Sequence, residues 1–234
     1  MDHHMVQQRF AALTTAHLAD ATGAERVLDV GGGIGGPTRQ LAHRFGYQVT
    51  VLDLTQAYCD VGETLTGWTR LNDRVSFVCG IALEMPFPDG SFDVVWTQHA
   101  AMNIPDKSRL CSKVARVSRP GGRLALFDVL AGPNQPIHFP VPWASDQSFS
   151  YLLPPAEVKA LIAQARFREV QWLMGQNLEA ELERPDPSGS AVPATSGLNP
   201  GLLNGPDGPR MGANVQRNIE EGCILFVMGV FERM

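Results

Sequence analysis

The chain has 234 residues, of which 44% are hydrophobic and 18% are charged, and its formal net charge is −5. This composition is ordinary for a globular protein, and the length suits one sizeable α/β domain over residues 1–234. The negative charge and the lack of a basic run give no electrostatic reason to expect nucleic acid or an anionic membrane surface as a partner.

Cysteine usage and the N-terminal sequence bear on the compartment. The four cysteines are far apart and lack metal-ligand spacing, so we expect structural thiols in a reducing environment. There is no basic-then-apolar signal pattern, and the longest apolar run, 223–231, is too short to cross a bilayer. We therefore expect a cytoplasmic protein. His3 and His4 are interpreted as part of the chain end, and no metal is expected.

The first elements along the chain are a helix over 5–22 and then a strand, a glycine turn and a helix over 26–45. Pro37 suits the first helical position, because its missing N–H costs nothing there. Glycines at such a turn let the backbone approach a ligand closely, and the helix N-terminus supplies free N–H groups and a positive dipole end. Alone, the turn fits a dinucleotide site, another nucleotide-like ligand or simply a tight loop.

The next strand, 48–53, ends in a carboxylate. An acid at this place can accept hydrogen bonds from both hydroxyls of a ribose, so Asp53 is the strongest single candidate for ligand binding. The glycine pattern is Asp29-x-Gly-x-Gly-x-Gly35 rather than the dinucleotide fingerprint. An acid two residues before the first glycine disfavours a pyrophosphate and suits a cationic or zwitterionic ligand such as S-adenosylmethionine.

Strands continue to alternate with helices, which indicates βαβ units and a parallel sheet. Further strands are expected over 74–79, 92–96, 123–128, 169–174 and 222–231, and helices over 55–67, 105–117 and 154–167. Pro120-Gly-Gly is expected to form a tight turn before the strand that starts at 123. The last strand is nearly all apolar and should be buried on both faces.

Two stretches interrupt the alternation. Residues 132–150 are rich in proline and aromatic residues, and residues 183–214 are rich in Pro, Gly, Ser and Asn. Loops of this length in a compact domain are usually lids or binding loops, or are disordered. We expect the first to cover a substrate, and the second to be either a further piece of lid or a partly disordered insertion.

From the glycine motif onward the chain resembles the class I S-adenosylmethionine-dependent methyltransferases. The resemblance implies a Rossmann-like sheet of seven mostly parallel strands, with helices on both faces, an antiparallel last strand and lid loops. It implies that Gly31, Gly32 and Gly33 pass under the methionine part of the cofactor. Asp29 would reach the ammonium group through water, and Leu54 would lie against the adenine.

The loop after the third strand, Gly80-Ile-Ala-Leu-Glu-Met-Pro-Phe-Pro-Asp-Gly-Ser-Phe-Asp, is similar to the family's Gly-Asp-Ala…Leu-Pro-Phe…Ser-Phe-Asp. In the family the acid of Gly-Asp-Ala accepts a hydrogen bond from the adenine amino group. Here that position is Ile81, which can pack on the ring but cannot accept the bond. Backbone groups of Ala82 or water would have to do so, at a cost on the order of 1 kcal/mol.

The fourth strand runs into Gln98-His99, which resembles the small-molecule branch that includes sarcosine/dimethylglycine and tocopherol methyltransferases. The same branch is indicated by Gly35-Gly-Pro-Thr, by Asp53-Leu-Thr…Tyr58 and by Phe139-Pro-Val-Pro-Trp-Ala144. Gln98 is expected to line the cofactor pocket. His99 would face the acceptor, either as a general base or as a residue that shapes the pocket. The candidate acceptor contacts are Met102, Asn103, His138, Phe139 and Trp143.

The expected activity is transfer of a methyl group from S-adenosylmethionine to an N, O or C nucleophile of a small, apolar or aromatic molecule, by in-line displacement. The alternatives are an enzyme with the same fold and cofactor but different chemistry, an NAD-dependent dehydrogenase, and a non-catalytic binding protein. Only about 25 residues precede the glycine motif, fewer than the family usually has. We therefore expect a more open site, or one completed by a second copy of the chain in a homodimer or by the long C-terminal loop.

Overall fold

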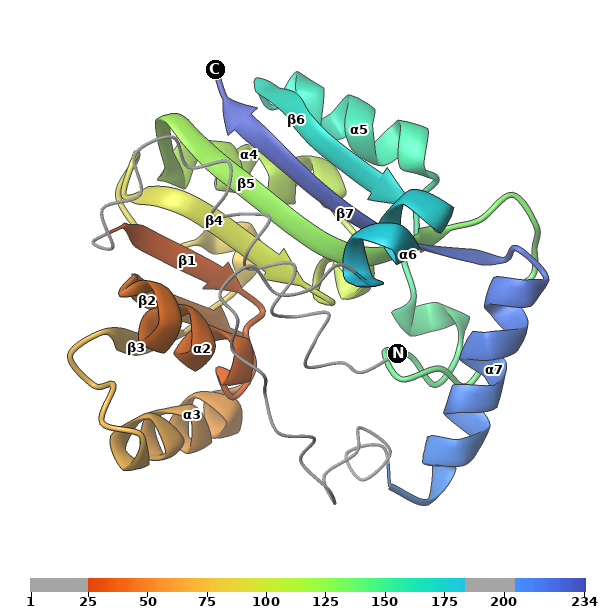
Figure 1. Ribbon diagram of the computed structural model, residues 1–234, viewed down its shortest axis with the longest axis horizontal. Helices are drawn as coiled ribbons and strands as arrows, with labels where there is room; N and C mark the ends of the chain where they lie inside the picture. Colours follow the sequence, from red (N-terminus) through yellow and green to blue (C-terminus); the bar gives the residue numbers. More distant parts are fainter. Residues whose placement is uncertain (1–24, 184–204) are drawn as a thin grey trace.

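The computed structural model describes residues 25–183 and 205–234, which build one twisted sheet with helices on both sides (Figure 1). The strands are β1 (Arg26–Val30), β2 (Gln48–Asp53), β3 (Val75–Cys79), β4 (Phe92–Gln98), β5 (Ser118–Ala131), β6 (Phe167–Met174) and β7 (Ile224–Arg233). The expected helix over 5–22 lies outside the described residues.

The seven strands lie in the order β3-β2-β1-β4-β5-β7-β6. The strands β1 to β5 pair in parallel, and β7 lies antiparallel between β5 and β6. This confirms the expected Rossmann-like sheet and its antiparallel last strand. From β1 the chain adds strands toward β3 on one side, and from β4 it adds them toward β5 on the other, so the strand order reverses between β1 and β4. Open α/β sheets bind ligands in the crevice at the carboxyl ends of two such strands.

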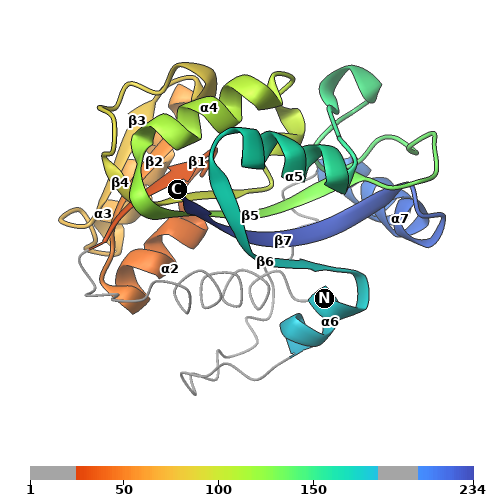
Figure 2. The ribbon, with the colours of Figure 1, turned by 90° about the horizontal axis from the view of Figure 1, so that it is seen from above.

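Helices cover the two faces of the sheet, and α7 lies beyond the end of β5 and the start of β7 (Figure 2). They are α2 (Gly36–Phe45), α3 (Gln56–Trp68), α4 (Lys107–Val117), α5 (Pro155–Gln164), α6 (Gly175–Glu183) and α7 (Gly208–Glu220). Leu41 of α2 and Leu178 of α6 pack into one hydrophobic cluster, and Leu110 of α4 and Ile162 of α5 pack into another on the opposite face. Among the described helices none combines the length and apolar character that a membrane span requires.

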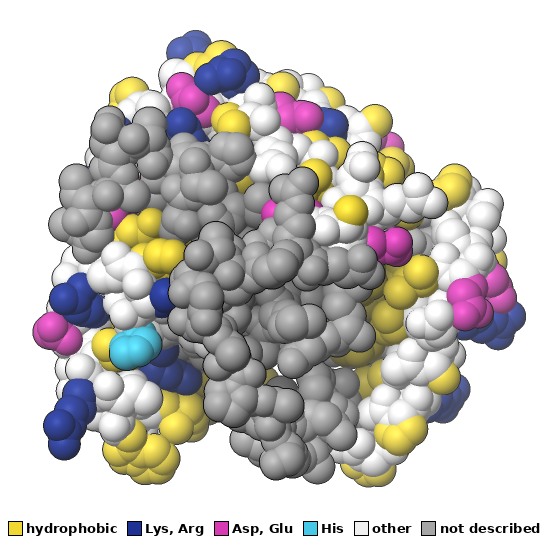
Figure 3. All heavy atoms as spheres, viewed as in Figure 1, with side chains coloured by type: hydrophobic (Ala, Val, Ile, Leu, Met, Phe, Trp, Pro, Cys, Tyr) yellow, Lys and Arg dark blue, Asp and Glu magenta, His cyan; other side chains and the backbone are white. Residues whose placement is uncertain are grey.

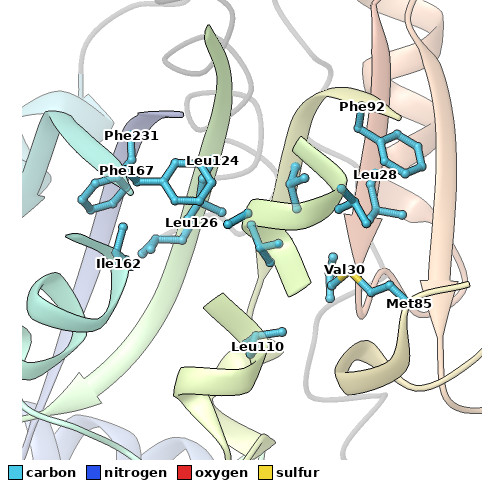
Figure 4. Packing of buried hydrophobic residues seen from close by; sticks show 14 of the residues in the cluster. Leu28, Val30, Met85, Phe92, Leu110, Leu124, Leu126, Ile162, Phe167 and Phe231 are labelled. Carbon is cyan, nitrogen blue, oxygen red and sulfur yellow. The ribbon is translucent and has the colours of Figure 1, made fainter. Parts of the chain in front are cut away.

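Alternation along the strands produces these two clusters. In β1, Val27 points to the α2 face and Leu28 to the α4 face, and in β5, Leu124 and Ala125 divide in the same way. Successive side chains of a strand point to opposite faces, so apolar runs are needed where both faces are covered. Figure 4 shows the α4 face, with Leu28, Val30, Met85, Phe92, Leu110, Leu124, Leu126, Ile162, Phe167 and Phe231 labelled.

Two local expectations were wrong. Pro120-Gly-Gly is a bulge inside β5 rather than a turn before it, because β5 already pairs with β4 at Ser118 and the register then shifts to Arg123. Gly121 takes a φ of 73° there, which glycine adopts readily. The predicted loop 183–214 also contains the start of α7. The Gly-Pro pair at 208 that suggested a loop opens this helix, since proline is tolerated in the first turn.

Candidate functional site

The glycine turn between β1 and α2 lies against the corner after β4. A Cβ on Gly31 would lie 2.4 Å from the Cβ of Ala100, and Gly31 has a φ of 74°. Only glycine fits both conditions. Gly33 also has a positive φ, but a Cβ there would meet nothing within 4 Å. The turn is therefore tightly packed at its base and open at Gly33, where a ligand can approach the backbone.

Asp29 lies beneath this turn, with only 2% of its surface exposed. One carboxylate oxygen accepts a hydrogen bond from the Thr38 hydroxyl of α2, and a Cβ on Gly32 would lie 2.6 Å from the same oxygen. Burial raises the pKa of Asp29 to about 6, the Thr38 hydrogen bond opposes this rise, and the charge of Asp53 adds to it. A buried acid of this kind gains from a nearby cation, as the ammonium group of an amino acid would be.

Asp53 ends β2 with its carboxylate oriented by the backbone. Its Oδ2 accepts the N–H of Gly33 at 2.9 Å and its Oδ1 accepts the N–H of Thr55 at 2.9 Å. Each oxygen of an ionised carboxylate can accept more than one hydrogen bond, so both retain capacity for a ribose hydroxyl. Thr55 is the N-cap residue of α3, but its side chain makes no capping hydrogen bond.

Two apolar side chains stand exposed beside Asp53. Leu54 is 70% exposed and Ile81 is 48% exposed, and they follow β2 and β3 at the same edge of the sheet. Large apolar side chains left so open at the ligand-binding edge suit the flat face of an aromatic base. Ala82 begins a short 3-10 turn directly after Ile81.

Gln98, the last residue of β4, has a side-chain amide that lacks hydrogen-bond partners in the described part of the chain. Both its Oε1 and its Nε2 are buried, and neither has a hydrogen-bond partner in the described part of the chain. Buried polar groups are normally satisfied, so an orphan amide at a binding edge indicates a place where a ligand supplies the partner.

His99 follows in the left-handed region of the backbone, with a φ of 52°. Its N–H donates to the carbonyl oxygen of Phe127 at 2.9 Å, and its ring lies 4.5 Å from the ring of Phe127 and 6.3 Å from that of Phe226. Non-glycine residues seldom adopt this conformation and do so where neighbouring structure holds them. The imidazole is thus fixed against an aromatic wall formed by β5 and β7.

Two side chains, the buried Asp128 and Lys107, hold the turn over residues 100–104 that follows His99. Oxygens of Asp128 accept the N–H groups of Met102 and Val129, and Ala101 also donates to this carboxylate. The Nζ of Lys107 donates to the carbonyl oxygens of Ala101 and Ile104. Burial raises the pKa of Asp128 to about 7, whereas burial lowers the pKa of Lys107 to about 8.

The sequence analysis missed this pair. An acid near the end of an otherwise apolar strand is the signal that singled out Asp53, and Asp128 shows the same signal at β5. Lys107 could not have been found in this way, because its role depends on the path of the backbone after β4.

The predicted acceptor contacts divide into two groups. Met102 is buried in a cluster at the ends of β5 and β7, and Phe139 and Trp143 are half-buried against it. The side-chain Nδ2 of Asn103 donates to the carbonyl oxygens of Trp143 and Phe149, at 2.7 and 2.9 Å. These residues are brought together beside the His99 wall, since Phe226 also packs against their cluster. His138 is directed elsewhere: its Nε2 lies 2.6 Å from Oε2 of Glu221, at the end of α7.

Residues 28–126 match the family described as "Methyltransferase domain". A probable tocopherol O-methyltransferase from Oryza sativa subsp. japonica is 40% identical over 129 residues, covering 53% of this chain and 36% of that protein. A putative sarcosine dimethylglycine methyltransferase from Galdieria sulphuraria has a TM-score of 0.75 at 20% identity, covering 97% of this chain and 84% of that structure. The [4+2]-cyclase SpnF has a TM-score of 0.69 at 18% identity, covering 97% and 80%.

Residues 28–126 thus match the methyltransferase domain family, and the chain has the Rossmann-like fold of the solved methyltransferases. The resemblance inferred from the sequence is confirmed at this level. The chain spans less than half the length of the curated relatives that it matches, for example 36% of the tocopherol enzyme and 40% of the methyltransferase GfsG from Streptomyces halstedii.

Proposed function

We propose that this protein transfers a methyl group from S-adenosylmethionine to an N, O or C nucleophile of a small molecule. The observation that carries the proposal is the carboxylate of Asp53, fixed by the N–H of Gly33 at the carboxyl edge of a sheet whose strands β1, β2 and β4 lie within the matched methyltransferase domain. This arrangement suits a ribose whose ligand continues over an open glycine turn.

The residues present fit the cofactor at each of its parts. Asp53 would accept the ribose hydroxyls, Leu54 and Ile81 would pack on the adenine, and Ala82 would offer its backbone to the ring edge. The turn at Gly31, Gly32 and Gly33 would lie under the methionine portion, with Asp29 favouring its ammonium group and the Gln98 amide satisfied by its polar atoms. The bound cofactor supplies an electrophilic methyl group on a sulfonium.

His99 is proposed as the group that takes a proton from the acceptor. Its ring is held against Phe127 and Phe226, so a flat or apolar acceptor could lie in contact with the same wall. Met102, Asn103, Phe139 and Trp143 would border this acceptor, directly or by holding the loop that closes over it. Positioning of the nucleophile in line with the methyl group would provide much of the acceleration.

The acceptor is proposed to be a small molecule rather than a nucleic acid or a membrane lipid, a choice supported by the net charge of −5. A cytoplasmic location is proposed with it, supported by the four cysteines, all of which are free.

A second candidate is an enzyme that uses the same fold and cofactor for a reaction other than methylation. The structural similarity to a [4+2]-cyclase favours keeping it, although at 18% identity that similarity concerns the fold alone. The two candidates differ in whether S-adenosylhomocysteine is formed during turnover.

The first experiment is calorimetric titration of the full chain with S-adenosylmethionine, S-adenosylhomocysteine and NAD. We expect the two sulfur compounds to bind and NAD not to bind. Loss of hydrogen bonds to a charged group costs about 1.5–3 kcal/mol, so Asp53→Ala should weaken cofactor binding about 10- to 100-fold. The control Asp60→Ala alters an exposed acid on α3 and should bind like the parent.

An acceptor screen follows, with S-adenosylhomocysteine formation as the readout, over phenols, amines and apolar carbon nucleophiles. Product formed only with an acceptor present supports methyl transfer. Conversion of a bound substrate without S-adenosylhomocysteine would favour the second candidate. Binding of NAD in place of the sulfur compounds would contradict both and indicate a dehydrogenase.

A further inference from the structure

Three side chains of types that can bind a metal ion meet at the junction of the 132–144 loop, the end of α7 and the start of β7. The ligand atoms of His138, Glu221 and Cys223 all lie within 4.8 Å of one another. The closest pair is His138 Nε2 and Glu221 Oε2, at 2.6 Å. The imidazole is partly exposed, the carboxylate is exposed and the thiol is buried.

Two hydrogen bonds from the buried side chain of Asn218 fix the backbone at His138. Asn218 of α7 is fully buried, its Oδ1 accepts the N–H of His138 at 2.8 Å, and its Nδ2 donates to the carbonyl oxygen of His138 at 3.0 Å. An asparagine that satisfies both backbone groups of one residue holds that residue in a single place. His138 is therefore positioned toward α7 without any help from its own side chain.

The other two residues are fixed by the loop that follows β5. Gly132 donates its N–H to the carbonyl oxygen of Cys223 at 2.8 Å, and the side chain of Asn134 donates to the carbonyl oxygen of Glu221 at 2.6 Å. Gly222, between them, has a φ of 69°, so the chain turns sharply and both side chains can face the same point. All three backbones are thus held before any ion binds.

The donor set is an imidazole nitrogen, a thiolate sulfur and a carboxylate oxygen, which are the ligand types that Zn²⁺ takes at about 2.0–2.3 Å. Glu221 and an ionised Cys223 together balance the charge of a divalent ion. The second oxygen of Glu221 is held by the Nε of Arg217 at 2.7 Å, which fixes the carboxylate and leaves Oε2 toward His138. Figure 3 shows basic and acidic side chains side by side at this end of α7.

We propose that His138, Glu221 and Cys223 form a site for a divalent transition-metal ion of the zinc type, with solvent at the fourth position. In the ion-free protein the hydrogen bond between His138 and Glu221 occupies this place. When the ion binds, it replaces that hydrogen bond, and the thiol of Cys223 loses its proton to solvent. It fastens the loop that carries Phe139 and Trp143 to α7 and β7, and its ligands do not include Asp53 or His99.

The test is titration of the full-length, metal-stripped protein with Co²⁺, whose thiolate complexes give a sulfur-to-metal charge-transfer band. We expect one equivalent of Co²⁺ to bind with this band, and Zn²⁺ to displace it. Cys223→Ser should abolish the band. Even outer-shell changes cost about 10- to 100-fold in metal affinity, so His138→Ala and Glu221→Gln should lose at least about tenfold.

Matched controls separate this site from other ligands in the chain. Cys79→Ser changes an exposed thiol elsewhere, and a double variant, His3→Ala with His4→Ala, removes the histidine pair near the start of the sequence. Both should keep the band and the affinity. A band that persists in Cys223→Ser, an affinity unchanged in His138→Ala, or no band in the parent would overturn the proposal.

Stability supplies a second readout, since Cys223 is buried and its variant could fold poorly. Zn²⁺ bound only by the folded state raises the melting temperature. The rise should occur in the parent and be lost in His138→Ala, whose side chain is partly exposed. An equal rise in both proteins would place the ion elsewhere. These results do not depend on cofactor binding, which Asp53→Ala tests separately.

Discussion

The carboxylate of Asp128 accepts the backbone N–H of Met102 at 3.2 Å, and this bond joins β5 to the corner that carries His99. The acid lies on the α4 face of the sheet, whereas the ring of His99 lies against Phe127 and Phe226. Asp128 thus holds the backbone next to His99, the proposed base, from the opposite face of the sheet. Lys107 also stabilises this segment, because its Nζ donates to the carbonyl oxygens of Ala101 and Ile104.

Removing this acid should destabilise the whole domain. Asp128→Ala leaves buried N–H groups of the corner without an acceptor, and an unsatisfied buried group costs about 1–3 kcal/mol. We expect a loss of this size in the free energy of unfolding, measured by urea denaturation at pH 7. Asp89→Ala removes an exposed partner of Arg116 and should change stability by less than about 0.5 kcal/mol. Equal stability of the two variants would contradict the role assigned to Asp128.

Stability should also depend on pH through Asp29. Its pKa is raised from 3.8 to about 6 in the folded protein, so between these values the folded state binds more protons than the unfolded state. The contribution of Asp29 to stability therefore falls as pH rises from about 4 to about 6 and is constant above. Asp29→Asn should make this fall smaller in a series of urea titrations and leave the part due to Asp128, whose pKa is also raised. Asp73→Asn, at an exposed acid, should keep the whole fall. A slope unchanged in Asp29→Asn would show that the group titrates normally.

Substitutions in the glycine turn should affect stability at Gly31 and ligand binding at Gly33. In Gly31→Ala the new methyl group would overlap Ala100, so we expect a strongly destabilised protein. In Gly33→Ala there is room for the methyl group, and the positive φ costs roughly 1–2 kcal/mol. Gly33→Ala should therefore fold yet bind S-adenosylmethionine weakly, because the methyl group stands where the ligand approaches. Calorimetry and thermal melting of both variants measure this, and unchanged binding in Gly33→Ala would place the cofactor elsewhere.

For His99, the decisive measurement is the pH dependence of turnover with an acceptor found by the screen. Loss of a general base typically lowers kcat about 10²- to 10⁴-fold. We expect this loss in His99→Gln, with one limb of the pH–rate profile removed and cofactor affinity retained. A variant that keeps the limb and changes only the KM for the acceptor would identify His99 as a residue that shapes the pocket.

Asn103 should act through the loop that it holds. Asn103→Ala removes the two hydrogen bonds to the carbonyl oxygens of Trp143 and Phe149, so the loop should open more often. We expect faster cleavage of residues 139–150 in limited proteolysis and a higher KM for the acceptor, with little change in kcat. Asn72→Ala, at an exposed position, is the control. Equal proteolysis rates would mean that other contacts hold the loop.

The sequence predicted the sheet well and placed the glycine turn and Asp53 at its carboxyl edge, because these features depend on local patterns. Apolar strands, a glycine turn and an acid after β2 each carry their meaning within a few residues, and Asp53 and Gly33 lie where these patterns put them. The antiparallel β7 came from the family resemblance, since periodicity does not encode strand direction. The start of α7 was missed because Gly and Pro favour both loops and helix starts.

What could not be predicted depends on contacts between distant segments. His138 was assigned to the acceptor as part of an aromatic loop, and its pairing with Glu221 arises because α7 packs beside that loop, 83 residues further along the chain. The hydrogen bonds of Asn218 to the backbone of His138, and of Asp128 to the segment after His99, also depend on contacts between distant segments. A single sequence gives the chemistry of such residues but not which of them meet.

The place of β7 has a consequence for the order in which the protein can be built on the ribosome. β6 has one neighbour in the sheet, and that neighbour is β7, which follows it by 50 residues from Met174 to Ile224. While the chain is being synthesised, β6 must therefore remain an unpaired strand, and β5 must keep an open edge, until the last of the described strands has left the exit tunnel. The first five strands can pair without β7, so the region that would hold the cofactor can form before Phe226 of β7 completes the aromatic wall beside His99.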